Sequence, residues 1–336
     1  MRPGRSRRTG LTGGRAFLPS AEPDYSWPMK EHRFTIAIPT HNRRGTVVLS
    51  VLSGLRQTRS PEEVLVLCDG CTDGTADAVR ALGDERVVAI ELPKGPGYAY
   101  VHRNEALRRA RGEVVLWVGD DDLLLPDHLE RIGEYWDRDE FDIVTTAAAI
   151  VHPDDSLEWF GQDWSVPWHR ESMLDDNTNP MTSVSVTVEM AERAGGWRAE
   201  HPRAEDWELW KRVLAIPARA AMTNEPTVLH FRATNREQAW PDRVRQNAEW
   251  LTRISDPATL AEVRWLLKRL GPQRDARLRD MLEDERRKSA WLRDMIEAEQ
   301  RERRDREAEL ERIYNGGWWR LRSRLLPLMR IAGKGE

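Results

Sequence analysis

The feature that most constrains the fold is an alternation of short apolar runs with helix-like segments between residues 33 and 126. The runs are apolar at nearly every position, which is typical of strands buried on both faces of a sheet. The segments between them carry apolar residues at helical spacing instead. This pattern predicts an α/β domain in which helices flank a mostly parallel sheet. We expect its strands at 33–40, 62–70, 85–92 and 112–122.

Polar side chains stand at the carboxyl ends of three of these strands, and we expect them to meet at one edge of the sheet. They are Thr40, His41 and Asn42 after the first strand, Asp69 at the end of the second, and Asp120, Asp121 and Asp122 at the end of the fourth. Three adjacent carboxylates repel one another, and burying them unpaired is costly. The sequence therefore predicts a bound Mg²⁺ or Mn²⁺, because such ions take carboxylate oxygens. The alternative is an acidic cluster that only favours the N-terminus of the next helix.

Residues 256–314 are expected to form a C-terminal helical region dense in Glu and Arg. Pairs such as Glu297 and Arg301 stand four residues apart with the acid first, which stabilises a solvated helix. A heptad spacing is also present, at Leu278, Met281, Leu292, Met295 and Ile313. The region can therefore be a single solvated helix or a short coiled coil that joins two copies of the chain.

Both ends of the chain are basic. Residues 1–32 are rich in Gly and Arg and lack an apolar h-region, so we expect disorder rather than a secretory signal. Residues 315–336 are basic and rich in Trp and Leu, which is the composition of a segment that lies on a membrane surface. The alternative for this tail is packing against the body of the protein.

The net charge and the cysteine content limit which partners and which cell compartment we expect. The formal net charge of −4 argues against a nucleic-acid partner. No run of about 20 apolar residues predicts a membrane-spanning helix. Cys68 and Cys71 are the two cysteines, and no second pair completes a zinc site. We therefore expect reduced thiols in a cytoplasmic protein that at most touches the inner face of the membrane.

Four segments, in order, resemble motifs of the family 2 glycosyltransferases. They are IAIPTHNR at 36–43, VLVLCDGCTDGT at 64–75, HRNEALRRARGEVVLWVGDDDLLLP at 102–126 and AEDWELWKRV at 204–213. The resemblance runs from Phe34 to about Arg232. It implies a GT-A domain at 33–255, with a nucleotide-binding half at 33–126 and an acceptor half at 127–255. The Trp-rich segment 159–168 would help shape the acceptor side, because aromatic faces pack on sugar rings.

The resemblance also implies a metal-dependent, inverting transfer of one sugar from a nucleotide-diphosphate sugar, with a UDP-sugar favoured. The acceptor would be a glycan, a lipid-linked molecule or a small molecule. Residues implied in nucleotide binding are Pro39, Thr40, His41, Asn42, Arg43, Asp69, Arg103 and Asp120. The implied metal ligands are Asp121, Asp122 and His230, although a lone His after an apolar run can equally be structural. Asp206 would be the catalytic base with Glu205 beside it, unless both only enrich the first turn of a helix in acid.

The sequence departs from the family pattern at several points. Gly119 aligns with the first Asp of the metal motif, which leaves open which two aspartates bind the ion. Cys68 replaces an Asp of the nucleotide motif. The Gln-X-X-Arg-Trp motif of processive enzymes is absent, which implies one sugar per encounter. Two other functions stay open: a nucleotidyltransferase acting on a sugar phosphate, and a non-catalytic scaffold that works through its C-terminal helix.

Overall fold

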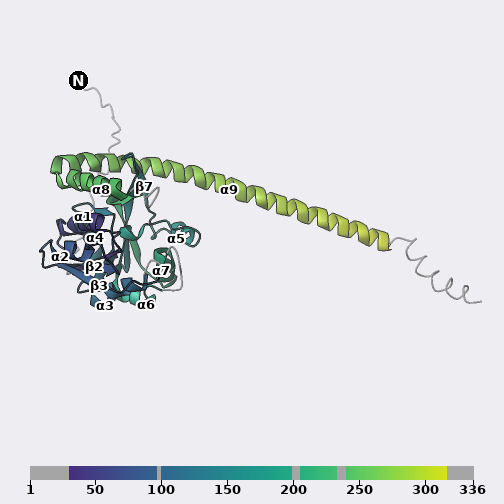
Figure 1. Ribbon diagram of the computed structural model, residues 1–336. Coiled ribbons are helices and arrows are strands. Elements are labelled where there is room, and N and C mark those ends of the chain that lie inside the picture. The colour runs from purple at the N-terminus through teal and green to yellow at the C-terminus, as the bar shows by residue number, and fades with distance from the viewer. Residues whose placement is uncertain (1–29, 97–99, 199–204, 233–239, 316–336) are drawn as a thin grey trace, which may run out of the picture.

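The computed structural model describes residues 30–96, 100–198, 205–232 and 240–315 (Figure 1). The basic N-terminal segment up to residue 29 and the tail from residue 316 lie outside the described residues. The expected disorder of the first and the expected membrane contact of the second therefore stay predictions.

The alternation of strands and helices in the first half is confirmed. Its strands lie side by side in the order β3-β2-β1-β4, and each neighbouring pair is parallel. The elements are β1 (Phe34–Thr40), α1 (Arg44–Leu55), β2 (Glu63–Asp69), α2 (Thr75–Arg80), β3 (Val87–Leu92), the 3₁₀ turn η1 (Tyr100–Arg103), α3 (Asn104–Arg109) and β4 (Val114–Trp117). Strand order reverses between β1 and β4, which is where open α/β sheets bind ligands, beyond the carboxyl ends of the strands.

The expected burial of the strands on both faces is wrong for β3. Every residue of β2 and β4 is buried. In β3, in contrast, Ile90 is buried and the other residues are partly or fully exposed. The reason is position, because β3 is the edge strand of this half in the described sheet.

The second half extends the sheet with strands of both directions. In the part of the chain that the structure describes, the sheet has nine strands in the order β3-β2-β1-β4-β8-β6-β9-β5, and β7 pairs with β6. The added strands are β5 (Leu123–Leu124), β6 (Ile143–Val151), β7 (Leu157–Phe160), β8 (Val184–Thr187) and β9 (Ala220–Phe231). Because β8 runs antiparallel to both β4 and β6, the sheet is mixed here rather than purely parallel.

Helices cover both faces of the sheet and bury separate apolar clusters (Figure 1). α1, α2 and α4 (His128–Trp136) pack on one face, where they bury residues such as Val51 and Ile132. α3, α6 (Val188–Arg193) and α7 (Glu205–Ala215) pack on the other, around Trp210. A third cluster joins β5, β6 and β9 to α8 (Trp240–Ser255) and the start of α9. The remaining short elements are α5 (Pro167–Ser172) and the 3₁₀ turn η2 (Met181–Ser183).

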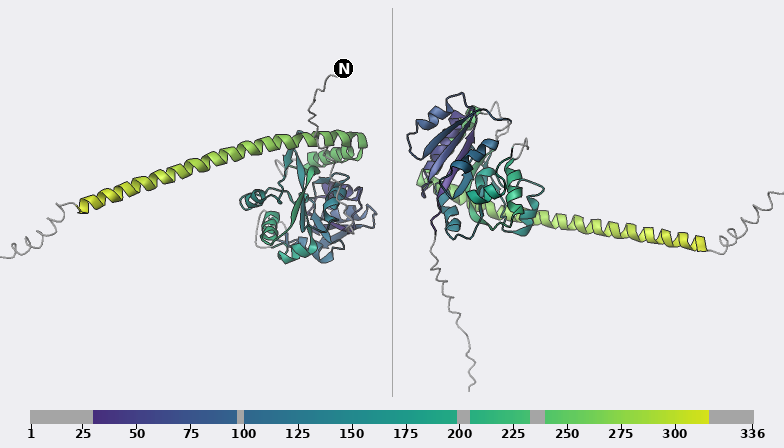
Figure 2. Two further views of the ribbon diagram at one scale, coloured as in Figure 1. Left: turned by 180° about the vertical axis from the view of Figure 1, so that it is seen from behind. Right: turned by 90° about the horizontal axis from the view of Figure 1, so that it is seen from below.

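α9 (Pro257–Asn315) starts on the body of the protein and then extends far beyond it (Figures 1 and 2). Val263 and Leu267 in its first turns are buried in the third cluster. Further along, apolar side chains on the projecting part are exposed: Trp291, Leu292, Met295, Ile296 and Leu310. Among the described residues, no helix combines the length and the apolar character that crossing a bilayer would need.

The Trp-rich segment contributes less to the surface than we expected. Trp164 is fully buried, and its ring lies 6.4 Å from that of Trp210 in the core. The expected acceptor role is therefore wrong for Trp164. Trp168 in α5 stays a candidate, because 38% of its surface is exposed.

Candidate active site

The acidic triplet lies in a turn after β4. We expected this strand to continue to residue 122, but it ends at Trp117. The amide of Asp122 donates to the carbonyl of Gly119 at 3.1 Å, so the backbone reverses within the triplet instead of extending through it. The turn brings Asp120 and Asp121 to the same arginine, Arg43, and directs Asp122 toward His230.

Asp122 is directed into the protein and is saturated with hydrogen-bond donors. Its oxygens accept from His230 Nδ1 at 3.0 and 3.1 Å and from the amide of Phe231 at 3.2 Å. The hydroxyl of Thr182 donates to the same carboxylate. Burial opposes ionisation, but His230 and these hydrogen bonds hold the pKa of Asp122 below its usual range. In return, Asp122 outweighs the effect of burial on His230 and raises its pKa to about 8. The pair is therefore ionic at neutral pH.

The packing of Asp122 also explains the departure at Gly119. A Cβ atom at position 119 would lie 2.7 Å from Oδ2 of Asp122 and 3.0 Å from its Cγ. A side chain at 119, such as the Asp of the family pattern, would displace that carboxylate. Glycine is thus required here as long as Asp122 keeps its inward position.

Asp120 pairs with a cation from the loop after β1. Nη1 of Arg43 lies 2.8 Å from Asp120 and 3.6 Å from Asp121. Burial raises the pKa of Asp120, although Arg43 opposes the rise. The sequence places Arg43 and Asp120 in one site, and in the structure they form an ion pair that joins the loop after β1 to the turn after β4.

Asp121 is the carboxylate with the least compensation. In the described residues its carboxylate accepts no hydrogen bond, and its cationic neighbour Arg43 is 3.6 Å away. Burial, Asp120 and Asp122 together raise its pKa to about 7. The side chain is 20% exposed, so it is accessible from the mouth of the site.

These carboxylates are chemically suited to a divalent ion that a diphosphate helps to hold. Among the described residues, no three His, Cys, Asp or Glu side chains are grouped so that they could hold an ion by themselves. Mg²⁺, however, is commonly bound by one or two carboxylates together with substrate phosphates. Asp121 and its neighbour Asp120 meet that requirement, and a cation would remove the repulsion that raises the pKa of Asp121.

Asp69, at the end of β2, is already engaged by protein donors. One oxygen accepts from the amide of Gly95 at 2.7 Å, and the other lies 2.5 Å from Nζ of Lys94. Nδ1 of His102 lies 3.2 Å from Asp69, and Nδ1 of His41 is 2.5 Å from its carbonyl oxygen. These contacts bring the loops after β1, β2 and β3 together, as the sequence predicts.

The loop after β1 is held by local contacts. Asn42 has a φ of 53° and its side-chain oxygen accepts from the amide of Thr72 at 2.7 Å. Pro39 and Thr40, the last residues of β1, pair with Leu67 and Cys68 of β2. The residues assigned to nucleotide binding in this loop therefore share one edge with Asp69.

Arg103 lies over two aromatic rings. Its guanidinium carbon lies 4.5 Å from the ring centroids of both Tyr100 and Trp197. Those rings are nearly parallel, with an interplanar angle of 13°. An arginine fixed in this way keeps its charge while its orientation is set by the rings.

Asp206 lies in the first turn of α7, where Nδ2 of Asn177 donates to its carboxylate at 3.2 Å. Asn177 is five residues before Thr182, whose hydroxyl contacts Asp122. An extended chain spans at most about 3.6 Å per residue, so the Cα atoms of Asn177 and Thr182 are at most roughly 18 Å apart. Through this segment Asp206 is connected to the acidic turn. Glu205 begins α7, but its side chain lies outside the described residues.

Arg243 in α8 is a site residue that sequence reasoning missed. It is 7% exposed, and Nη2 donates to the carbonyl of Arg232 at 2.6 Å. Nη1 is buried and has no hydrogen-bond partner among the described residues. Burial lowers the pKa of Arg243 although Asp121 and Asp122 are close enough to raise it. No motif marks this residue, because it is one of many arginines in a charged C-terminal sequence.

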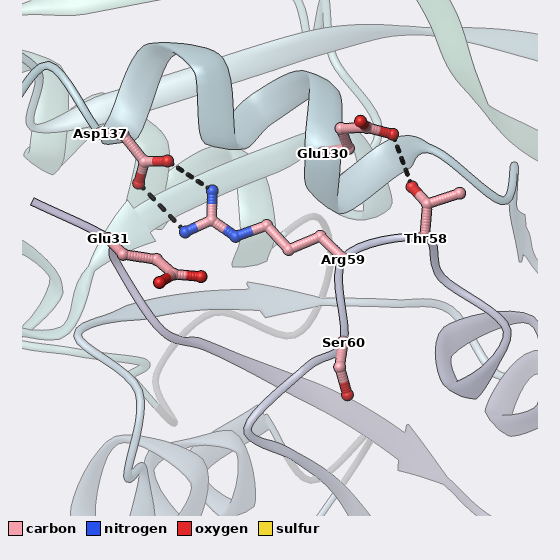
Figure 3. Close-up of a pocket in the computed structure, with 6 residues that line it drawn as sticks. All are labelled: Glu31, Thr58, Arg59, Ser60, Glu130 and Asp137. Atoms are coloured by element: carbon pink, nitrogen blue, oxygen red, sulfur yellow. Dashed lines mark hydrogen bonds and ion pairs between the residues drawn. The ribbon is translucent and has the colours of Figure 1, made fainter. Parts of the chain in front are cut away.

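A cavity of about 570 Å³ lies elsewhere and is lined by Glu31, Thr58, Arg59, Ser60, Glu130 and Asp137 (Figure 3). Both terminal nitrogens of Arg59 donate to Asp137, so this cation already has an ion-pair partner. Residue 31 precedes β1 and residues 58–60 precede β2, so this cavity is at the amino ends of the strands, opposite the acidic triplet.

The sheet order and the position of the acidic turn at its carboxyl edge define an α/β protein of the GT-A kind. The model of the family "Glycosyl transferase family 2" matches residues 35–190. This match, over somewhat less than half of the chain, confirms the resemblance to family 2 glycosyltransferases seen in the sequence.

Similar proteins agree with this assignment. The succinoglycan biosynthesis protein ExoO of Rhizobium meliloti is 32% identical over 131 residues, which are 38% of this chain and 37% of that protein. The UDP-Glc:alpha-D-GlcNAc-diphosphoundecaprenol beta-1,3-glucosyltransferase WfgD of Escherichia coli is 32% identical over 104 residues, which are 30% and 40% of the two chains. The match thus spans well under half the length of these relatives.

A solved structure supports the fold. The crystal structure of S. aureus TarS 1-349 in complex with UDP-GlcNAc superposes with a TM-score of 0.52 at 18% identity, over 65% of this chain and 66% of that chain. At this identity the likeness concerns the fold and not the ligand.

Proposed function

We propose that the chain transfers a single sugar from a nucleotide-diphosphate sugar to an acceptor, with inversion at the sugar carbon. The family assignment supports transfer as the reaction class. WfgD and a second Escherichia coli relative, WfaP, are both named for a UDP-glucose donor, which supports a UDP-sugar here.

The observation that carries this proposal is that Asp121 is the least compensated carboxylate of the triplet. Asp122 is paired with His230 and Asp120 lies 2.8 Å from Arg43, whereas Arg43 is 3.6 Å from Asp121. Burial, Asp120 and Asp122 raise the pKa of Asp121 to about 7. A bound Mg²⁺ or Mn²⁺ would offset the negative charge that grows on the leaving diphosphate. In this proposal Asp121 and Asp120 hold the ion. Asp122 and His230, which the sequence suggested as metal ligands, instead hold the turn in position.

The other residues divide into donor and acceptor roles. The loops carrying His41, Asn42 and Asp69 contact the nucleoside, because they lie together at the edge next to β1. Nη1 of Arg243 donates to the diphosphate, which gives this buried atom the acceptor it lacks among the described residues. Arg103, which lies over two aromatic rings, adds positive charge on the donor side.

Asp206 is the base in this proposal. Asn177 holds its carboxylate in the first turn of α7, and the segment from Asn177 to Thr182 connects it to the acidic turn. From there it accepts the proton of the acceptor hydroxyl as that oxygen attacks the sugar carbon. An inverting transfer needs one such base on the face opposite the leaving group.

The two other functions considered from the sequence are less well supported. A nucleotidyltransferase would share the carboxylate-bound metal, but the family match is to glycosyltransferases. A non-catalytic scaffold would not need Asp121 to stay buried, crowded and accessible at a cost in stability. The experiment that tests the proposal is a screen of sugar nucleotides for donor hydrolysis with and without Mn²⁺. Hydrolysis of none of them by the wild type would contradict it.

The C-terminal region supports an inference about the acceptor. We infer a lipid-linked acceptor, because WfgD and WfaP are named for a diphosphoundecaprenol acceptor and the tail of this chain has the composition of a membrane-surface segment. α9 would then connect the catalytic domain to that surface.

We also infer that α9 pairs with α9 of a second copy. The exposed residues Trp291, Leu292, Met295 and Ile296 would form the contact. Antiparallel pairing about this segment places Lys288 opposite Glu299, whereas parallel pairing would oppose like charges. Light scattering should therefore report a dimer, and a double Leu292→Glu, Met295→Glu variant should be monomeric with an unchanged circular dichroism spectrum.

A further inference from the structure

The two cysteines of the chain lie on either side of Asp69, at the end of β2. Cys68 is 1% exposed and pairs with Thr40 of β1 in the parallel ladder. Cys71 is partly exposed, and its Sγ lies 3.7 Å from the carbonyl oxygen of the same Thr40. The amide of Asn42 donates to Cys71 Sγ at 3.4 Å. Both thiols therefore lie against the end of β1.

The turn between the two cysteines is tight. The amide of Gly70 donates to the carbonyl of Cys68 at 3.1 Å, and Gly70 has a φ of +59°. A Cβ at this position would lie 2.6 Å from Cβ of Lys94, so the turn requires glycine. The chain bends at Gly70, and the side chains of Cys68 and Cys71 interact directly. A disulfide between them requires Cα atoms about 4.4–6.8 Å apart.

The two thiols differ in reactivity. A hydrogen bond from Cys68 lowers the pKa of Cys71 to about 7. The same hydrogen bond, together with burial, raises the pKa of Cys68. The thiolate is the nucleophile in thiol chemistry, and Cys71 is the accessible one of the two. Cys71 is thus suited to react first, with Cys68 directly behind it.

We propose that Cys68 and Cys71 are a reversible dithiol–disulfide pair that a small-molecule disulfide oxidises. The thiolate of Cys71 attacks one sulfur of the small disulfide, forms a mixed disulfide and releases one small thiolate. That thiolate takes the proton of Cys68, whose sulfur then attacks Cys71 Sγ and releases the second small thiolate, which is protonated by solvent. Two protein thiols are oxidised to one disulfide, and one small disulfide is reduced to two thiols.

Oxidation has a consequence for the donor site, and this part rests on the proposed function. In a disulfide the two sulfurs are about 2.05 Å apart, so Cys71 Sγ turns toward Cys68 and away from the amide of Asn42. Asn42 keeps its contact with Thr72, in the segment that moves with Cys71. The loop carrying His41 and Asn42 is therefore displaced from Asp69, and the oxidised protein binds nucleotide more weakly.

The chemistry is tested on the full-length chain treated with oxidised glutathione, with peptide mass spectrometry as the readout. The wild type should lose the mass of two hydrogens in the peptide spanning 68–71 and regain it with dithiothreitol. Cys68→Ala should stop at a glutathione adduct on Cys71, and Cys71→Ala should leave Cys68 unmodified. A stable glutathione adduct on the wild type, or no modification of it, would overturn the proposal.

The consequence is tested by calorimetric titration of UDP into the reduced and the oxidised wild type. The dissociation constant should rise severalfold on oxidation and return on reduction, and a double Cys68→Ala, Cys71→Ala variant should show no change over the same treatment. Equal affinity of the two wild-type forms would overturn the effect on the loop. If the reduced protein bound no UDP while the disulfide still formed, the proposed function would fail and the thiol chemistry would stand.

Discussion

Asp122 and His230 are 108 residues apart in the chain, yet Nδ1 of His230 lies 3.0 Å from Oδ1 of Asp122. This ion pair joins the turn after β4 to the end of β9 and thereby fixes the acidic turn against the sheet. The relationship makes His230 a structural cation in the folded protein, and it makes the stability of the site dependent on pH.

His230→Gln should lower the free energy of unfolding by about 1–2 kcal/mol. This is less than the loss on breaking a fully buried ion pair, because the imidazole is 36% exposed and Asp122 keeps other donors. The folded pKa of about 8 lies above the ordinary value of 6.5. The stabilisation is therefore complete below pH 6.5 and is lost as the pH rises through 8. Urea unfolding from pH 6 to 9 measures this. A wild-type profile that matches that of His230→Gln would contradict the ion pair.

Asp121→Asn should reduce sugar transfer by orders of magnitude and leave the fold intact. Without metal, it should unfold at a temperature no lower than the wild type, because the change removes a carboxylate whose pKa burial and two neighbours raise to about 7. Mn²⁺ should raise the melting temperature of the wild type and not that of the variant. Full transfer in excess chelator would refute the metal assignment.

Asp206→Asn should lower the rate of transfer roughly 10²–10⁴-fold, as expected when a general base is removed. Binding of UDP should be unchanged, because the residue acts on the acceptor. Glu205→Gln is the matched control, since it removes the neighbouring acid in the same turn and should keep most of the activity. If Asp206→Asn lost UDP binding but turned over normally at saturation, the role of Asp206 would be wrong.

Arg243→Gln should weaken UDP binding by about tenfold or more, which is typical for the loss of a charged hydrogen bond. Binding of uridine, which lacks the diphosphate, should not change. Arg245→Gln controls for net charge, because Arg245 is on the same helix and 71% exposed. Calorimetric titration distinguishes these outcomes, and equal losses for UDP and uridine would indicate a structural role for Arg243 instead.

The full-length chain should float with anionic liposomes, and a chain that ends at Tyr314 should not. Each Lys or Arg near such a surface contributes about 1 kcal/mol, and the tail contains Arg320, Arg322, Arg324, Arg330 and Lys334. Binding should fall as salt is raised, because screening weakens these charges. Equal flotation of the two chains would leave the tail as a packing or self-association element.

The sequence by itself determined the strand–helix alternation, the resemblance to the family and the edge at which Asp69 and the acidic triplet gather. Hydrophobic periodicity and short motifs are properties of neighbouring residues, and the parallel strands of an α/β sheet place their carboxyl ends at one edge. Only the tertiary structure decided which charged side chains pair with each other. Asp122 meets His230 and Asp120 meets Arg43 across long stretches of chain, and that leaves Asp121 least compensated. It also decided that Gly119 makes room for a carboxylate, that Trp164 belongs to the core and that Arg243 lies near the site. The physical reason is that burial and ion pairing depend on what packs against a residue, and those neighbours are distant in the sequence.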